Sequence, residues 1–296
     1  MKRFKNILLL LVLLTLSFTL IAQTAHKVAN NGYKLVDDGG VFVELFAPFN
    51  THDNRFTEDN VTYPAGVSFT YDYAFLDRHG NEFLHRDLEA STLNTDQAWE
   101  LAPASQFNGS EVLSVQMTVL YGLQGLDLMK PGYNRTVVQY DYLTAAGKTN
   151  YSEVTGLVEN AKNIWVNPPR AKQFRILELN PVPFIQAPYA VGNKWNWSKR
   201  IGGFWGDARW AEWDGAIDNH YQYEITDMKT VETPFGALDC YEISAKADNT
   251  LGSTSLVAMF SPEYGFVQMN YTNIDGSKIV MNMTERTVQG FTAAKN

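Results

Sequence analysis

The chain has 296 residues and a formal net charge of −8, from 24 Lys and Arg against 32 Asp and Glu, which argues against nucleic acid or an anionic membrane surface as a partner. Its one cysteine, Cys240, excludes an internal disulfide and a metal cluster held by several cysteines. A chain of this length without disulfides depends on its hydrophobic core, which it is long enough to form.

The first residues have the pattern of a secretory signal peptide. A basic start over residues 2–5 precedes an apolar run over residues 7–21, which is shorter than the roughly 20 residues of a membrane-spanning helix. Cleavage after Ala22 would remove three basic residues and leave 21 against 32 acidic ones, a net charge of −11. No cysteine stands near this point to accept a lipid. We therefore predict a signal peptide at 1–22, no transmembrane segment in the mature chain, and export to the periplasm or the extracellular space.

The next part predicts an N-terminal β lobe over residues 37–165, after a polar, disordered stretch at 23–36. Apolar and aromatic side chains alternate with others in residues 67–75, which is typical of a half-buried strand. The pattern fades after residue 86, where residues 91–99 are compatible with a short helix. Gly147 lies in an expected hairpin turn. Further strands are expected at residues 41–46, 82–85, 112–121, 135–143 and 149–154.

Prolines are frequent in residues 166–190, which we predict to connect two parts of the chain. Proline removes a backbone donor, so this segment is not expected in the middle of a sheet. It is instead an edge, a crossover or a connection between lobes. Its apolar residues, among them Phe174, Ile176 and Leu177, nevertheless favour burial.

A meander of five strands is predicted within the C-terminal segment, residues 191–287, followed by a tail at 288–296. Hairpin-length connections leave no room for crossover helices, and Asp275-Gly276 is a strong hairpin signal. The predicted fold class is therefore all-β and mostly antiparallel, with an N-terminal β lobe, a curved C-terminal meander and little helix. The five strands are expected at 221–232, 238–247, 253–260, 266–273 and 277–285. One apolar face of the meander carries Val267, Met269, Tyr271, Ile279, Met281 and Met283.

Three local patterns resemble an uncharacterised family of bacterial envelope proteins. They are V-G-N-K-W at 191–195, T-P-F-G at 233–236 with Cys240 after it, and S-P-E-Y-G at 261–265. That family is similar to the periplasmic lipoprotein carriers, whose curved antiparallel sheet forms a half-open barrel over an apolar cavity. The resemblance covers residues 190–285. It implies a half-barrel for the C-terminal third and implies no catalytic residue.

Five of the seven tryptophans lie in residues 191–213, and we predict that they bind the ligand. Each ring has about 150–250 Å² of largely apolar surface, so the cluster needs a core or a ligand to cover it. The spacing places the first two rings on one strand face and the last two on one helical face. We expect this stretch to form a lid over the meander. The predicted ligand-binding residues are Trp195, Trp197, Trp205, Trp210 and Trp213.

The sequence contains few catalytic or metal-binding motifs. The five histidines are scattered, and neither a nucleophile elbow, a phosphate-binding loop nor a zinc-binding helix motif occurs. We therefore predict no metal and no cofactor. Acidic residues interleave with the tryptophans, and glycoside hydrolysis uses two carboxyl groups beside aromatic rings. These acids are Asp207, Glu212, Asp214 and Asp218.

The tryptophans are open to three interpretations: core packing, the lining of a cavity for an apolar ligand, or a surface on which sugars stack. Our leading hypothesis is an exported, non-catalytic protein that binds an apolar or amphipathic ligand, such as a lipid, in the cell envelope. One alternative is a carbohydrate-binding or glycoside-cleaving protein that uses the tryptophan stretch. The other is a structural envelope protein with no ligand. The oligomeric state is left open.

Overall fold

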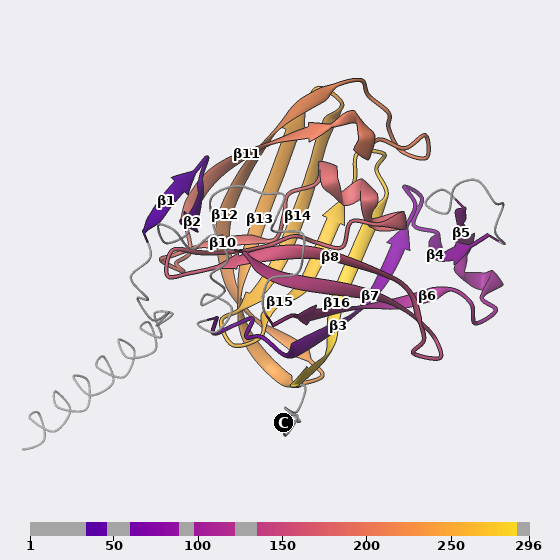
Figure 1. Ribbon diagram of the computed structural model, residues 1–296, viewed down its shortest axis with the longest axis horizontal. Helices are drawn as coiled ribbons and strands as arrows, with labels where there is room; N and C mark the ends of the chain where they lie inside the picture. Colours follow the sequence, from indigo (N-terminus) through magenta and orange to yellow (C-terminus); the bar gives the residue numbers. More distant parts are fainter. Residues whose placement is uncertain (1–33, 46–59, 89–97, 122–134, 289–296) are drawn as a thin grey trace, which may run out of the picture.

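The computed structural model describes residues 34–45, 60–88, 98–121 and 135–288 (Figure 1). The predicted signal peptide, most of the stretch expected to be disordered and nearly all of the tail lie outside these residues, as does most of the helix considered at 91–99. Within the described part, no helix is long and apolar enough to cross a membrane.

The described residues form mostly antiparallel β-structure, which confirms the predicted fold class. The strands are β1 (Leu35–Asp38), β2 (Val41–Glu44), β3 (Val67–Leu76), β4 (Glu82–Asp87), β5 (Trp99–Pro103), β6 (Val112–Val119), β7 (Thr136–Thr144), β8 (Thr149–Glu159), β9 (Asn163–Val166), β10 (Phe184–Gln186), β11 (Lys194–Gly202), β12 (Ala216–Thr233), β13 (Gly236–Asn249), β14 (Gly252–Ser261), β15 (Gly265–Thr272) and β16 (Lys278–Val288). Three short 3-10 helices are η2 (Ala104–Gln106), η4 (Lys172–Leu179) and η5 (Gly203–Trp205).

Strands β1 and β2 form a hairpin, and all other strands form one 14-stranded sheet. Its order is β10-β9-β8-β7-β6-β4-β3-β16-β15-β14-β13-β12-β11, with β5 paired to β4 and a further pairing of β6 with β3. The predicted meander is confirmed, because β12 to β16 are consecutive neighbours. Strand β3 pairs with β16 over most of its length. The strands of the two predicted lobes are thus joined in one sheet, and the division of the chain into two lobes stays a prediction.

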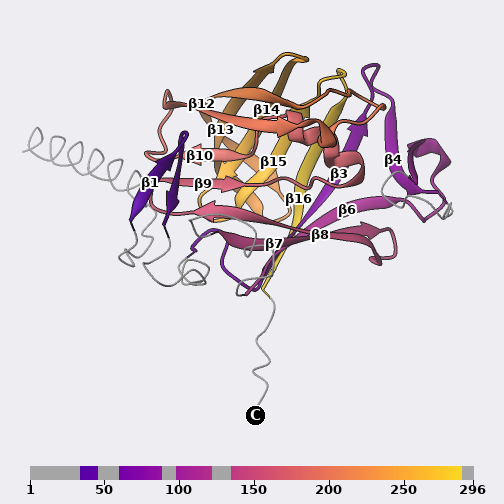
Figure 2. The same cartoon turned by 45° about the horizontal axis from the view of Figure 1, so that its top comes forward.

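The sheet curls into a nearly closed barrel, and its curvature brings the two end strands, β10 and β11, next to each other (Figures 1 and 2). Across this seam the ring centroids of Phe184 and Trp195 are 5.6 Å apart. The β1–β2 hairpin packs at the seam, where its Gly40 carbonyl accepts a hydrogen bond from the Gln186 side chain at 2.5 Å. Gly40 has φ +106°, and an added Cβ would lie 2.3 Å from the Asn196 carbonyl oxygen, so a larger residue does not fit there.

The inner face of the barrel carries the alternating side chains that the sequence indicates. In β3 the residues from Val67 to Phe75 at every second position are 6% exposed or less, and the meander residues from Val267 to Met283 named above are equally buried. Alternation places these side chains on one face of each strand, and the curvature of the sheet brings the faces together.

The proline-rich segment packs inside the barrel. Its helix η4 lies between the wall formed by β12 to β16 and the wall formed by β6 to β9 (Figures 1 and 2). Phe174 is 0% exposed, and its ring centroid is 5.0 Å from that of Tyr73 and 5.6 Å from that of Tyr142. This segment, and not the tryptophan stretch, therefore fills the space beside the inner face of the meander.

Candidate functional site

Two of the five tryptophans, Trp195 and Trp197, lie on β11 and face the core. Trp195 is 6% exposed and stacks on Tyr223 with ring centroids 5.3 Å apart, and Trp197 stacks on Tyr221 at 5.0 Å. They share a strand face, as their spacing indicates. Strand β11 pairs with β12 along its whole length, so this half of the stretch extends the meander as an end strand and is not a lid.

The other three tryptophans lie on residues 203–215, the tryptophan loop, at one end of the barrel (Figure 1). The expected helical face is absent, because residues 208–210 form a turn closed by an antiparallel bridge between Asp207 and Ala211, and residues 211–215 contain no helix. Trp213 donates its indole N–H to a carbonyl of β11 at 3.3 Å. Trp210 instead packs on Trp99, with ring centroids 6.5 Å apart. The five rings therefore do not form one cluster.

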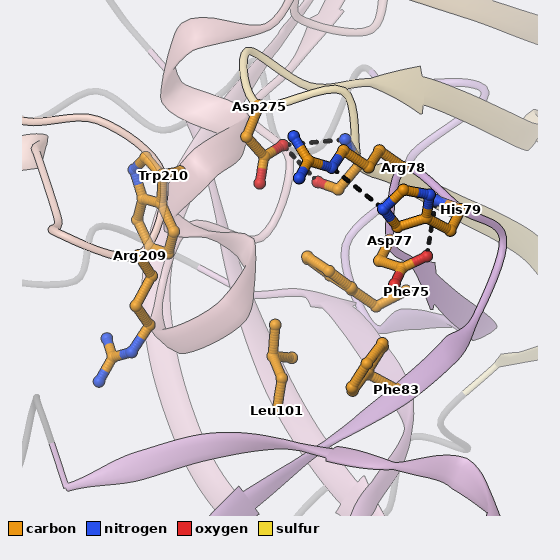
Figure 3. Close-up of a pocket in the computed structure, with 10 residues that line it drawn as sticks. Phe75, Asp77, Arg78, His79, Phe83, Leu101, Arg209, Trp210 and Asp275 are labelled. Carbon is orange, nitrogen blue, oxygen red and sulfur yellow. Dashed lines mark hydrogen bonds between the residues drawn. The ribbon is translucent and has the colours of Figure 1, made fainter.

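A cleft of about 410 Å³, the end cleft, lies beside Trp210 (Figure 3). The turn between β3 and β4, strand β5, the tryptophan loop and the turn between β15 and β16 each contribute to its walls. The apolar part of its lining consists of Phe75, Phe83, Leu101 and Trp210, and the polar part of Asp77, Arg78, His79, Arg209, Asp275 and Ser277.

Two acids hold the polar rim of the end cleft in place. Asp77 Oδ1 accepts backbone N–H bonds from His79 at 2.8 Å and from Asn81 at 2.9 Å. Its pKa is lowered, chiefly by the side-chain hydrogen bond from Asn81. Asp275 Oδ1 likewise accepts bonds from the Ser277 hydroxyl at 2.6 Å and backbone N–H at 2.9 Å (Figure 3). Both carboxylates therefore order turns, which are local structures that short polar side chains favour.

A second hollow, of about 200 Å³, contains three cationic residues, and we call it the basic hollow. The Trp205 ring lies against two of them, with guanidinium carbons of Arg170 at 4.4 Å and Arg175 at 5.4 Å from its centroid. Arg175 also donates to the backbone carbonyls of Phe204 and, at 3.3 Å, of Trp205. The basic hollow is lined by Trp99, Tyr151, Glu153, Arg170, Ala171, Lys172, Arg175, Trp205, Gly206 and Asp207.

The two hollows share a wall. Arg209, which lines the end cleft, lies over the Trp99 ring at 3.9 Å from its centroid. It also pairs with Asp207 at 2.7 Å. Trp99 and Asp207 line the basic hollow, and Trp99 packs on Trp210 of the end cleft. Strand β5 and the tryptophan loop therefore separate an apolar hollow from a cationic one.

His85 is buried beside this wall. It is 1% exposed, and its ring centroid is 5.3 Å from that of Trp99. Its Nε2 is 2.9 Å from Asp87 Oδ1, whereas its Nδ1 is buried with no hydrogen-bond partner among the described residues. Burial lowers the pKa of His85, because protonation would place a second, unpaired N–H in a site closed to water.

We expect stability to decline as the pH falls from about 7 to about 5. The unfolded chain binds a proton at His85 near the usual pKa of about 6.5, whereas the folded chain resists this proton, so lower pH favours the unfolded state. Urea denaturation at several pH values measures the effect. His85→Phe removes the group and should flatten the dependence; a variant as pH-sensitive as the wild type would contradict this assignment.

The structure places the predicted site residues in different surroundings. Trp205 and Asp207 line the basic hollow, Trp210 lines the end cleft, and the other three interleaved acids are exposed. Cys240 is buried, and burial raises its thiol pKa to about 11. Sequence reasoning did not single out Trp99 or the three cations. The run R-A-K-Q-F-R at 170–175 is the one signal that could have indicated a cationic turn.

Among known proteins, the chain resembles solved structures only in its fold. No family model matches the chain, and no curated protein matches it either. One similar solved structure is a predicted exported protein with a YmcC-like fold from Bacteroides fragilis, with 12% sequence identity and a TM-score of 0.36 over 75% of this chain and 96% of that one. A second is a predicted lipoprotein from Parabacteroides distasonis, with 12% identity and a TM-score of 0.41 over 76% of this chain and 96% of that one. A third is the hypothetical lipoprotein YmcC from Escherichia coli, with 10% identity and a TM-score of 0.28 over 80% of this chain and 96% of that one.

Proposed function

We propose that the protein binds an amphipathic small molecule in the end cleft without catalysing a reaction. The observation that carries the proposal is the size of this cleft, about 410 Å³, together with its four apolar side chains. Small-molecule sites typically have about 300–1,000 Å³ and a mostly apolar lining with a few polar groups. The apolar part of the ligand would contact Phe75, Phe83, Leu101 and Trp210, and the rim would face its polar part.

The interior of the barrel is a poorer candidate for this ligand. An internal cavity between Tyr63, Tyr140 and Met281 measures about 10 Å³, which is no more than the space of one water molecule. The ligand would therefore be held at the end of the barrel. This differs from the half-open barrel over an apolar cavity that the resemblance to lipoprotein carriers implies. Export, expected from the leader, motivates a ligand of the cell envelope.

A sugar-stacking surface is less well supported. Stacking needs an accessible aromatic face beside the carboxylates, but Arg209 covers Trp99 at 3.9 Å and Arg170 covers Trp205 at 4.4 Å. In these cation–π contacts a guanidinium group occupies one face of each of the two rings, which leaves less of their surface for a sugar.

Binding of decanol, a neutral amphiphile, tests the proposal. We expect saturable binding by isothermal titration calorimetry, and we expect Trp210→Ala to weaken it about tenfold, since truncation of a buried aromatic contact typically costs at least about 1–2 kcal/mol. Trp210→Phe, which keeps an apolar ring in the cleft, should bind within about threefold of the wild type.

The matched control is Phe204→Ala on the same loop. Phe204 is 71% exposed and lies outside the lining of both hollows, so its removal should leave the affinity unchanged. If wild-type protein shows no saturable binding of decanol, or if Phe204→Ala weakens binding as much as Trp210→Ala, the proposed function is wrong.

A further inference from the structure

The basic hollow concentrates positive charge in a protein whose overall charge is negative. Three cations, Arg170, Lys172 and Arg175, come from residues 170–175, which lead into and include the start of η4 and which we call the cationic turn, and they line about 200 Å³ of space. Of the two carboxylates in the lining, Asp207 is paired with Arg209 at 2.7 Å. That leaves Glu153 as the acid that faces the three cations from within the hollow.

Glu153 is engaged on one oxygen. Its Oε1 accepts the Tyr142 hydroxyl at 2.5 Å and the backbone N–H groups of Arg170 at 2.7 Å and Ala171 at 3.2 Å. Burial raises the pKa of Glu153, an effect that these donors oppose. Its structural role is to hold the start of the cationic turn. Two further acids near the cations, Glu178 beside Arg170 and Asp87 beside Lys172, lie outside the lining of the hollow.

Two features of the cationic turn are energetically unfavourable and indicate a binding site. Lys172 has φ +53°, a left-handed conformation that non-glycine residues adopt at a cost of about 1–2 kcal/mol. Its side chain is only 8% exposed and lies 5.2 Å from the Tyr151 ring centroid. The Nε of Arg170 is buried with no hydrogen-bond partner among the described residues, and a buried donor without an acceptor is unfavourable.

The other contacts of the cations fix them in position. Arg170 pairs with Glu178 at 2.6 Å, and Lys172 lies 4.0 Å from Asp87. Arg175 is bound to backbone carbonyls of the tryptophan loop. A set of donors held in this way before binding loses little conformational entropy when a ligand arrives.

We infer that the basic hollow binds the anionic group, a carboxylate or a phosphate, of an amphipathic ligand whose apolar part occupies the adjacent end cleft. This inference rests on the proposed function for the apolar part, and it narrows the ligand to an anionic amphiphile. The shared wall of Trp99, Asp207 and Arg209 places the two hollows side by side. Guanidinium and ammonium donors suit either anion.

Calorimetry with decanoate, decyl phosphate and decanol tests the inference. We expect one of the two anions to bind wild-type protein about tenfold more tightly than decanol, since charge-assisted hydrogen bonds typically contribute this much. The anion with the larger advantage identifies the group. Lys172→Asn should reduce the advantage to about threefold or less and leave decanol binding unchanged. Asparagine tolerates positive φ, so the turn should keep its conformation.

Lys246→Asn is the control, because Lys246 is an exposed cation on β13 outside both hollows; it should retain the full advantage of the anion. If neither anion binds more tightly than decanol, or if Lys172→Asn retains the advantage, the inference is overturned. If none of the three amphiphiles binds, the proposed function is wrong. Binding of sulfate, which has no apolar part, then tests the anion site by itself. Saturable sulfate binding that Lys172→Asn abolishes would support the site, and wild-type protein that binds no sulfate would overturn it.

Discussion

Replacement of Glu159 by alanine is expected to lower the free energy of unfolding by about 4 kcal/mol, because it leaves three backbone donors without their acceptor and each such loss costs about 1–3 kcal/mol when buried. Glu159 is 4% exposed. Its Oε1 accepts the N–H groups of Val61 at 2.9 Å and Thr62 at 2.8 Å, and its Oε2 accepts that of Tyr63 at 2.9 Å.

These bonds hold a segment that joins opposite parts of the barrel. The Tyr63 hydroxyl accepts the backbone N–H of Phe266 at 2.9 Å, and the Thr62 hydroxyl donates to the Pro262 carbonyl at 3.0 Å. Asn60 donates to the Thr136 hydroxyl at 2.9 Å. Loss of Glu159 should therefore loosen β7 and β8 from the turn between β14 and β15.

Urea denaturation of Glu159→Ala and Glu159→Gln measures the effect. The glutamine variant keeps one carbonyl acceptor, so about half of the loss is expected. Glu242→Ala is the control, because Glu242 pairs with the exposed Lys229 at the surface, where solvent screens the charges, so its removal should cost much less than that of Glu159. If Glu159→Ala costs no more than Glu242→Ala, the three bonds do not stabilise the barrel.

Phe174→Ala is expected to destabilise the protein by a similar amount, about 4 kcal/mol, because a phenylalanine removed from a tight core leaves a cavity that neighbours cannot fill. Phe174 is fully buried and packs edge-on against Tyr73 of β3 and Tyr142 of β7. It therefore links the proline-rich segment to two separate parts of the sheet.

The same denaturation measurement tests this role. Phe174→Leu retains most of the apolar volume and should cost less than about 2 kcal/mol, whereas Phe204→Ala removes the same ring from a 71% exposed site and should cost less than about 0.5 kcal/mol. Equal effects of Phe174→Ala and Phe204→Ala would mean that η4 is not part of the core.

Much of the sheet could be predicted from the sequence because its strands carry local signals. Residues 67–75 alternate, and β3 buries the same side chains that the alternation selects. Turns such as Asp275-Gly276 identify the hairpins of the meander. Strand β5 was missed because the pattern between residues 86 and 104 is weak, and this strand pairs with β4 alone. Alternation is clearest where one face of an antiparallel strand packs on the core and the other faces solvent.

The candidate site was predictable only in part. The tryptophan density pointed to Trp205 and Trp210, which do line the two hollows. Their partners were not predictable, because Trp99 lies 111 positions before Trp210, and the arginines that contact Trp205 lie on another segment. The rings of Trp195 and Trp197 were assigned to the same site, yet they face the core, because their side of β11 is the inner side.

The sequence by itself determined most of the longer strands of this protein, the hairpin order of the meander and the side chains on the inner faces of these strands, because alternation and turn residues act over a few neighbouring positions. Only the tertiary structure decided that β3 joins β16, that the proline-rich segment fills the barrel, and that the tryptophan loop separates an apolar hollow from a cationic one. These features depend on contacts between residues distant in the chain, which the curvature of the closed sheet brings together.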